Sequence, residues 1–446
     1  MNPARERQVP APNTFHIGLV VPDYTGQLSP MATLGRELLR RGHRVTLVSL
    51  PDAGTKSFTA RFAFAPIGER EFPVGSLARF SEEQGQLTGL AAIRFIVRGY
   101  VREVEVLLRD LPVLVQQHGI DALLVDQVYG AGNTVAEHLD IPVVNVCNAL
   151  ALNTEPGVPP FMTAWPYHPS LLARVRNILG DQVIAWVIRP VLQRINERRA
   201  AWGLPLISSV NDGSDLAQIT QQPPFFDFPR TRLPDSFHYT GPFHDEDSTE
   251  PVSFPWEQLD GRPLIYASMG TLQNRLPHIF QAIATACAGL DAQLVISLGS
   301  TDVEPPTGLA GNPIVVRYAP QLDLLARTSL VITHAGINTT LEALAHGVPM
   351  VALPVGNDQP GVAARLKYLG AGEFIPVHKV TPARLRAAIG KVSGDPAYRA
   401  KAQHYKRRIA ELDGVRRAAD IAEEAFRTRR PVHRQEMSET TEGGRR

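Results

Sequence analysis

One segment, residues 331–359, constrains the fold of this chain more than any other. It opens with a short apolar run that is typical of a buried strand and breaks at residues 334–336, His-Ala-Gly. Apolar residues then recur at helical spacing until Gly347, and a second apolar run follows at residues 350–353. The order strand, small-residue turn, helix, strand is the repeating unit of a parallel α/β sheet, so we expect this segment to lie inside one.

The turn at residues 334–336 is suited to bind an anion. The amides of a first helical turn lack intrahelical partners and carry partial positive charge, and Gly336 lets a ligand approach the backbone closely. Side-chain donors at the same place are His334, Asn338, Thr339 and Thr340. An alternative needs no ligand, because Thr339 and Glu342 have the spacing of a capping box and a histidine before a helix is commonly structural. The segment by itself leaves both interpretations open.

The same segment, with the residues that precede it, resembles the donor-binding signature of the GT-B nucleotide-sugar glycosyltransferases of the UDP-glycosyltransferase type. In that family a Trp-x-Pro-Gln-like element comes first, and residues 318–321 read Tyr-Ala-Pro-Gln here. The resemblance implies that His334 and the backbone of residues 336–339 hold the diphosphate of the donor. It assigns the remaining roles to Glu342 on the ribose hydroxyls, Asp358 and Gln359 on the sugar hydroxyls, Tyr318 stacked on the base, and Gln321 beside it.

Two successive series of strand and helix patterns predict the fold class, which is α/β with two Rossmann-like domains whose parallel sheets face a central cleft, as in GT-B proteins. The first series opens with a strand at residues 16–21, and Ser29 and Pro30 have the residue types of an N-cap and a first helical position. The predicted boundaries are a disordered N-terminus at 1–13, an acceptor-binding domain at 14–241, an acidic Pro/Ser-rich linker at 242–258, a donor-binding domain at 259–426, and a disordered tail at 427–446.

Helical patterns at residues 193–202 and 410–426 belong to this alternation, and by resemblance the second of them packs back onto the first domain. Ligands of open parallel sheets bind beyond the carboxyl ends of strands, where Asp126 and the turn at residues 268–271 stand. By resemblance that turn matches a family position near the donor phosphate, with Ser268, Gly270 and Thr271. Residues 245–247, Asp-Glu-Asp, match a metal-binding pattern, but their place in the linker favours a solvated acidic run. We therefore expect no metal and no cofactor other than the sugar donor.

Stretches in the middle of the chain carry a narrower resemblance, to the zeaxanthin glucosyltransferases of carotenoid synthesis. They are residues 126–139, 153–159, 226–230, 266–273 and 358–365. This resemblance implies UDP-glucose as the donor and a long apolar alcohol as the acceptor, although a phenolic acceptor is also compatible with the wider family. The implied chemistry is an inverting displacement at the anomeric carbon of the sugar, in which a general base takes the proton of the acceptor hydroxyl.

The usual base of the family is absent from this sequence. It is a histidine in a Gly-His-x-x-Pro element, oriented by an aspartate at the position of Asp126, whereas here Gln27 stands in the place of the histidine. Three explanations remain open: Asp126 is the base and Gln27 orients the acceptor hydroxyl, Asp23 in the same loop is the base, or the protein binds nucleotide sugars without ordinary transfer. Asp23 could equally be a turn residue, and Asp126 a residue that caps neighbouring amides.

Composition excludes several other classes of protein. A formal net charge of +1 argues against a nucleic-acid partner, and no G-x-G-x-x-G follows the first strand, which argues against a dinucleotide-dependent dehydrogenase. Cys147 and Cys287 lie in separate apolar contexts, as expected for reduced thiols in a cytoplasmic protein. Neither a signal peptide nor a membrane span is predicted.

A carotenoid acceptor would imply transient contact with a membrane and a peripheral location there. Trp165, Trp186 and the apolar stretch at residues 183–192 could supply that contact, and packing in the core is the alternative for them. We expect the chain to be a monomer or a weak dimer.

Overall fold

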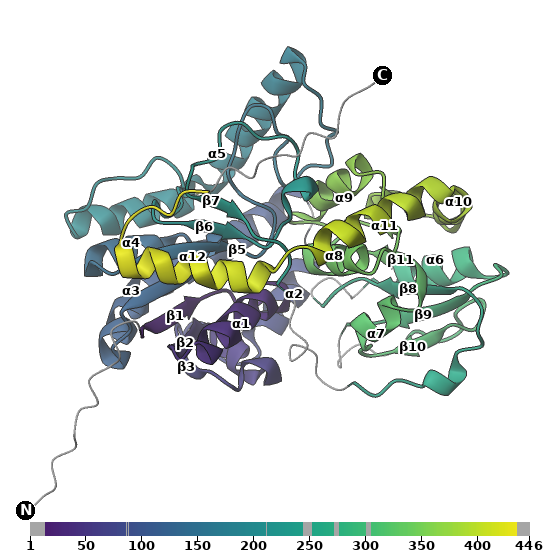
Figure 1. Cartoon of the computed structure of the whole chain (residues 1–446), viewed down its shortest axis with the longest axis horizontal. Coiled ribbons are helices and arrows are strands. Elements are labelled where there is room, and N and C mark those ends of the chain that lie inside the picture. Colours follow the sequence, from purple (N-terminus) through teal and green to yellow (C-terminus); the bar gives the residue numbers. More distant parts are fainter. Residues whose placement is uncertain are drawn as a thin grey trace, which may run out of the picture.

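The structure is a computed structural model that describes residues 14–85, 87, 89–210, 212–243, 252–271, 276–299 and 305–434. Within this part of the chain, two parallel sheets form the centres of two lobes (Figure 1). The first sheet has the order β3-β2-β1-β4-β5-β6-β7 and the second has the order β10-β9-β8-β11-β12-β13. Every pairing is parallel, so the α/β fold class predicted from the sequence is confirmed.

The strands of the first lobe are β1 His16–Val20, β2 Arg44–Ser49, β3 Ala63–Pro66, β4 Ala122–Asp126, β5 Val143–Cys147, β6 Gln218–Thr220 and β7 Phe237–Tyr239. Its helices are α1 Thr25–Arg40, α2 Ser76–Gly85, α3 Gly89–His118, α4 Ala131–Leu139 and α5 Leu171–Ala201. The strand order reverses between β1 and β4, and a reversal of this kind opens a crevice at the carboxyl ends of the two strands.

The strands of the second lobe are β8 Leu264–Ser268, β9 Gln293–Ser297, β10 Ile314–Val316, β11 Thr328–Thr333, β12 Met350–Ala352 and β13 Gly372–Phe374. Its helices are α6 Pro277–Cys287, α7 Gln321–Leu325, α8 Ile337–Ala345, α9 Gln359–Tyr368, α10 Pro382–Gly394 and α11 Pro396–Ala410, followed by α12 Gly414–Thr428. Here the order reverses between β8 and β11, and ligands of open parallel sheets typically bind at the carboxyl ends of strands beside such a reversal.

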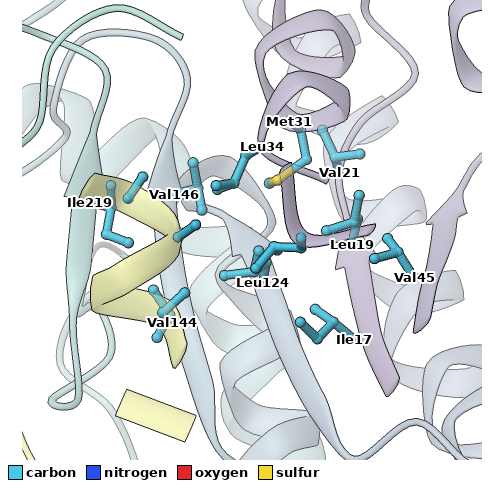
Figure 2. Close-up of a cluster of buried hydrophobic side chains, with 14 of the residues drawn as sticks. Ile17, Leu19, Val21, Met31, Leu34, Val45, Leu124, Val144, Val146 and Ile219 are labelled. Carbon is cyan, nitrogen blue, oxygen red and sulfur yellow. The ribbon is translucent and has the colours of Figure 1, made fainter. Parts of the chain in front are cut away.

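The core of the first lobe explains why its strands are apolar on both faces. Figure 2 shows Ile17, Leu19, Leu124 and Val144 of the sheet packed together with Met31 and Leu34 of α1. Apolar residues of α12 complete the same cluster, and α12 lies across the first lobe beside α1 (Figure 1). The opposite face of the sheet packs against residues of α3, α4 and α5. Sheets covered on both faces have strands that read as continuous apolar runs.

Two predicted helix boundaries are wrong. Helix α1 begins at Thr25 with Tyr24 as its N-cap, so Ser29 and Pro30 lie inside the helix and do not begin it. Proline has no N–H, and the carbonyl of Gly26, four residues earlier, therefore has no helical donor. That carbonyl instead accepts a hydrogen bond from Asn338 Nδ2 of the second lobe, at 2.9 Å. The geometry of α1 is thus coupled to the other lobe.

The helix predicted at residues 193–202 is the end of the much longer α5, whereas the one predicted at 410–426 corresponds to α12, which begins at Gly414 and ends at Thr428. The predicted disordered tail starts too early, because the backbone N–H of Val432 donates to Leu216 O at 2.8 Å. Residues 1–13 and the acidic 245–247 lie outside the described residues. The domain boundaries stay predictions.

Candidate active site

The turn between β11 and α8 leaves the first amides of α8 without a side-chain cap. Gly336 is the N-cap residue and no described side chain bonds to these amides, so the capping box of Thr339 and Glu342 is wrong. Ala335 has a left-handed backbone, with φ of 67°, which is uncommon for a residue with a Cβ. Strained residues of this kind persist where the surroundings hold them, often at binding sites. The turn therefore presents free amides to an anion, as helix N-termini do.

The ring of His334 is fixed between two glycines. A Cβ on Gly270 would lie 2.7 Å from Nε2 of His334, and a Cβ on Gly336 would lie 2.5 Å from the same nitrogen. Both positions therefore require glycine. Burial lowers the pKa of His334 to about 4, so the ring is neutral at pH 7. Its Nδ1 is buried without a hydrogen-bond partner among the described residues. A neutral ring can still donate one hydrogen bond to a phosphate oxygen.

The turn after β8 lies beside this one, because Ser268 and Thr333 are paired at the ends of neighbouring strands. Gly270 has φ of +76°, and its amide donates to Ser268 Oγ at 3.4 Å. Thr271 is exposed at the surface next to it. Both turns predicted to hold the diphosphate thus meet at one edge of the second sheet.

A chain of side-chain hydrogen bonds links α7 to α8. Tyr266 OH donates to Gln321 Oε1 at 3.0 Å, and Gln321 Nε2 donates to a carboxylate oxygen of Glu342. The same nitrogen lies 3.4 Å from Thr339 Oγ1. Burial raises the pKa of Glu342 to about 7. Tyr318, three residues before the start of α7, has 42% of its surface exposed. Its ring is therefore accessible from solvent, as stacking on a base requires.

The segment after β12 reaches the first lobe. Asp358 Oδ2 accepts a hydrogen bond from the backbone of Leu150 at 3.1 Å, and burial raises the pKa of Asp358. Gln359 Oε1 accepts from the amides of Val355 and Gly356, at 2.9 and 3.2 Å, so it holds its own loop in shape. Asp358 therefore stands at the seam between the lobes.

Asn338 connects the turn at residues 334–336 to the first lobe through two side-chain hydrogen bonds. Its Nδ2 donates to Gly26 O, and its Oδ1 accepts from Gln221 Nε2 at 2.8 Å. The sequence places Asn338 at the turn but gives no sign of Gln221, whose position depends on how the lobes meet. The first turn of α1, which carries Gly26 and Gln27, consequently faces the turn at residues 334–336.

Asp126 ends β4 with both carboxylate oxygens engaged. Oδ1 accepts from the amide of Val128 at 2.9 Å, and Oδ2 accepts from Asn148 Nδ2 at 2.7 Å. Burial raises the pKa of Asp126 to about 6. Gln27 Oε1 is buried and has no hydrogen-bond partner among the described residues. Asp126 thus acts at least as a cap on neighbouring amides.

Asp23 belongs to a group of buried acids that the sequence did not reveal as a unit. It is 4% exposed, and burial with the nearby charge of Asp52 raises its pKa to about 7. Burial and the charge of Asp23 in turn raise the pKa of Glu103, on α3, to about 8. Tyr129 OH donates to Glu103 Oε2 at 2.9 Å. The only sequence signal for Glu103 is an acid within an otherwise apolar helix face, which is rarely buried without a reason.

Comparisons with known proteins agree with this geometry. The family model for "UDP-glucoronosyl and UDP-glucosyl transferase" matches residues 69–409. The chain belongs to this family. It is 30% identical over 433 residues to zeaxanthin glucosyltransferase of Pantoea ananas, which covers 94% of this chain and 97% of the relative. It is 31% identical over 416 residues to zeaxanthin glucosyltransferase of Pseudescherichia vulneris, covering 92% of this chain and 98% of the relative.

A solved structure gives the fold independently of close sequence similarity. The glycotransferase of kitacinnamycin superimposes with a TM-score of 0.70 at 23% identity, over 93% of this chain and 100% of that one. The GT-B fold and membership of the UDP-glycosyltransferase family, both expected from the donor signature, are therefore confirmed. The protein is a glycosyltransferase, an enzyme of a family that binds nucleotide-sugar donors and acceptors.

In this glycosyltransferase a buried ion cluster joins the lobes. Arg365 of α9 bonds to Asp227 Oδ1 through Nε and Nη2, at 2.9 and 2.7 Å, and Arg230 Nε contacts Oδ2 at 2.6 Å. Burial opposes the charge of Asp227, yet Arg365 and Arg230 hold its pKa well below its usual range. The sequence stretches that contain these residues carry the family resemblance, but their pairing across the lobes is visible only in the structure.

Neither a metal-ligand cluster nor a membrane-spanning helix occurs in the described residues. Among the described residues no three His, Cys, Asp or Glu side chains gather as a metal would need. Within the same residues, no helix combines the length and the apolar character needed to cross a bilayer.

Proposed function

We propose that the enzyme transfers a sugar, glucose, from a UDP-sugar to a hydroxyl group of an apolar small molecule, with inversion and without a metal ion. The acceptor class follows the names of the two relatives, which act on zeaxanthin. The observation that carries the proposal is the uncapped N-terminus of α8, which faces the first lobe through the bond from Asn338 to Gly26. An anion-binding turn opposite an acceptor loop is the arrangement that sugar transfer requires.

The donor would be held mainly by the backbone. Amides of α8 and the neutral ring of His334 bind the diphosphate and stabilise the charge that grows on it as it leaves. Glu342 accepts hydrogen bonds from the ribose, and Tyr318 stacks on the base. Asp358 stands at the seam between the lobes, and with the neighbouring Gln359 it would bind the sugar hydroxyls there. Preorganised amides can carry this charge without a Lewis acid.

Asp23 is our candidate for the general base. The acceptor oxygen attacks the anomeric carbon, the bond from that carbon to the diphosphate breaks, and the hydroxyl proton passes to the carboxylate of Asp23. A base is most effective when its pKa is near the working pH, and that of Asp23 is about 7. Asp126 is less suited, because both of its oxygens already accept hydrogen bonds. Gln27 would orient the acceptor by donating a hydrogen bond from its side-chain amide to the acceptor oxygen, which leaves the single hydroxyl proton for Asp23.

The experiment combines binding and turnover. Titration calorimetry with UDP and UDP-glucose should give binding, and zeaxanthin, flavonoids and simple phenols should be screened for transfer in the presence of EDTA. NMR of the product should show a β-glucoside formed from the α-linked donor. If neither UDP nor UDP-glucose binds, the proposal is wrong. A product that retains the α-configuration would contradict inversion, and loss of activity in EDTA would contradict metal independence.

A second candidate function is nucleotide-sugar binding without ordinary transfer, which the replacement of the usual histidine by Gln27 favours. In that case wild type would bind UDP-glucose but transfer nothing, and Gln27→His would gain activity. Activity in the wild type that Gln27→His does not raise excludes this candidate.

We also propose a cytoplasmic location with transient contact to a membrane. The thiols of Cys147 and Cys287 are free and buried, as is usual in a reducing compartment. Fractionation of expressing cells tests this, and recovery in an extracellular fraction would contradict it.

A further inference from the structure

The first half of α5 exposes an apolar face to solvent. Its exposed side chains, with exposed fractions, are Leu171 77%, Leu172 84%, Val175 54%, Leu179 57%, Val183 61% and Trp186 71%, and we call this set the α5 face. Spacings of three and four residues place most of them along one side of the helix. The set covers about 24 Å of helix at the usual rise per residue. Core packing, the alternative weighed for Trp186, is therefore wrong.

The opposite side of this half of α5 is the one that packs on the protein. Ala173 and Asn177 are buried there, and Asn177 Nδ2 donates to Pro156 O at 3.1 Å. A Cβ on Gly180 would approach side chains of Pro160 and Trp165 to 2.9 Å, so the helix lies tightly on this segment. Apolar patches of this extent are uncommon on monomers and usually mark an interaction surface.

The charges around the α5 face are mostly positive. Arg174 and Arg189 are exposed on the same stretch of helix, and Arg176 lies over the ring of Trp165. The one acid between Leu171 and Pro190 is Asp181, whose pKa burial raises to about 6. Apolar side chains combined with arginines and an exposed tryptophan are typical of helices that lie in the headgroup region of anionic membranes.

The α5 face is connected to the acceptor side of the active site by one continuous segment. Residues 148–169 run from the end of β5 to the start of α5. At the site end, the amide of Leu152 donates to Gln127 Oε1 at 3.2 Å, directly after Asp126. At the other end, the same segment supports α5 through Pro156. A membrane held at α5 would lie next to the segment that borders the acceptor.

Segments of this chain outside the described residues are poor candidates to cover the face. Residues 1–13 and 435–446 are dominated by polar residues, glycine and proline, with few large apolar side chains between them. Neither could replace much of the water on a surface of this length.

We propose that the α5 face docks on the surface of an anionic lipid bilayer, with its apolar side chains at the headgroup boundary and its arginines on lipid phosphates. Docking there would let an apolar acceptor pass from the membrane toward the cleft, and this consequence rests on the proposed function. The docking itself does not depend on sugar transfer.

Co-sedimentation of the full chain with vesicles of phosphatidylcholine containing about one third phosphatidylglycerol tests the proposal. We expect wild type to sediment with these vesicles, more weakly with phosphatidylcholine alone and more weakly at high salt. Leu179→Asp combined with Trp186→Asp should lower the partition coefficient about tenfold or more, since two apolar side chains are lost from the contact. Leu206→Asp is the matched control, because Leu206 is 66% exposed but lies beyond the end of α5. It should partition as wild type does.

Two outcomes overturn docking: wild type that stays in the supernatant with anionic vesicles, or a double variant that sediments like wild type. A dimer in light scattering that the double variant converts to monomer, without vesicle binding by wild type, would assign the face to a second copy of the chain. Turnover of a water-soluble phenol should be equal in both variants. If wild type binds vesicles but transfers no sugar, the proposed function fails and the docking surface stands.

Discussion

The two segments that meet between the lobes handle charge in opposite ways. The donor turn at residues 334–337 has backbone amides, glycines and a neutral histidine, and a Cβ on Gly336 or Gly270 would come within 2.5 or 2.7 Å of Nε2 of His334. Residues 22–27, which join β1 to the first turn of α1 and which we call the acceptor loop, depend on side chains, with Asp23 among buried acids and Gln27 Oε1 without a partner in the described chain. Under the proposed function, the backbone amides of the donor turn would serve any nucleotide sugar, whereas the side chains of the acceptor loop could be exchanged to suit a new acceptor. The difference between the two segments is that one depends on backbone geometry and the other on the identity of its side chains.

The largest expected effect comes from the acceptor loop. Asp23→Asn should lower kcat by about 10²–10⁴-fold, the usual range for a general base, while the affinity for UDP stays within twofold. Steady-state kinetics and calorimetry measure the two quantities. Asp126→Asn is the companion variant, and it should lower kcat less than Asp23→Asn does. The reverse order would transfer the role of base to Asp126.

The next effect concerns the joint between the two lobes. Arg365→Met leaves Asp227 with one of its two buried arginine partners and should lower the free energy of unfolding by about 3 kcal/mol, measured by urea denaturation. Lys367→Met on the same helix removes an exposed pair with Glu373 and should cost about 0–1 kcal/mol. Equal losses in the two variants would show that the buried cluster does not stabilise the joint.

This cluster also sets a pH dependence. Because its arginines hold the pKa of Asp227 below its usual range, its contribution is present above the unfolded pKa of about 3.9 and is lost as the pH falls below it. Arg365→Met should therefore lose less of its remaining stability in acid than wild type loses.

A substitution in the donor turn tests whether its backbone holds the diphosphate. Gly336→Ala puts a Cβ 2.5 Å from Nε2 of His334, so the ring or the turn must move. We expect kcat/KM for UDP-glucose to fall about a hundredfold, comparable to the loss of one preorganised donor. Gly390→Ala is the control, since a Cβ there meets nothing within 4 Å. A donor turn that tolerates Gly336→Ala would contradict the backbone-held diphosphate.

The smallest effect is a shift in the pH profile. A base with pKa of about 7 must be deprotonated, so kcat/KM should rise as the pH passes through 7 and then level off. The charge of Asp52 raises that pKa, and Asp52→Asn should move the acidic limb of the profile to lower pH by about half a unit. Asp260→Asn, in the other lobe, should not move it. An unshifted limb in Asp52→Asn would show that a group other than Asp23 titrates.

The sequence predicts which residues meet at the turn of residues 334–336 but not the surroundings of Asp23, for a physical reason. Residues 331–359 are consecutive, so strand, turn and helix bring His334 and Gly336 together by local geometry alone. The pair Ser268 and Thr333 needed only the register of two neighbouring strands. Glu103, in contrast, lies on α3, far from Asp23 in the sequence. The pKa values of both are raised mainly by burial, which sequence spacing does not reveal.

Local patterns also misled where a distant partner decided the outcome. Ser29 and Pro30 have the composition of a helix start, but α1 begins at Thr25. Thr339 and Glu342 have the spacing of a capping box, but Glu342 bonds to Gln321 of α7. The contacts of Asn338 with Gly26 and of Arg365 with Asp227 could not be foreseen, since they depend on how one lobe is seated on the other.

A proline inside a helix ordinarily destabilises it, because one helical hydrogen bond is lost. In α1 the carbonyl left unpaired by Pro30, that of Gly26, accepts instead from the side-chain amide of Asn338, which lies 312 residues further along the polypeptide. A residue with an N–H at position 30 would bond to the carbonyl of Gly26 within the helix and would withdraw that carbonyl from the opposite half of the enzyme. Because Pro30 has no N–H, the carbonyl of Gly26 is available for a hydrogen bond that joins the two halves.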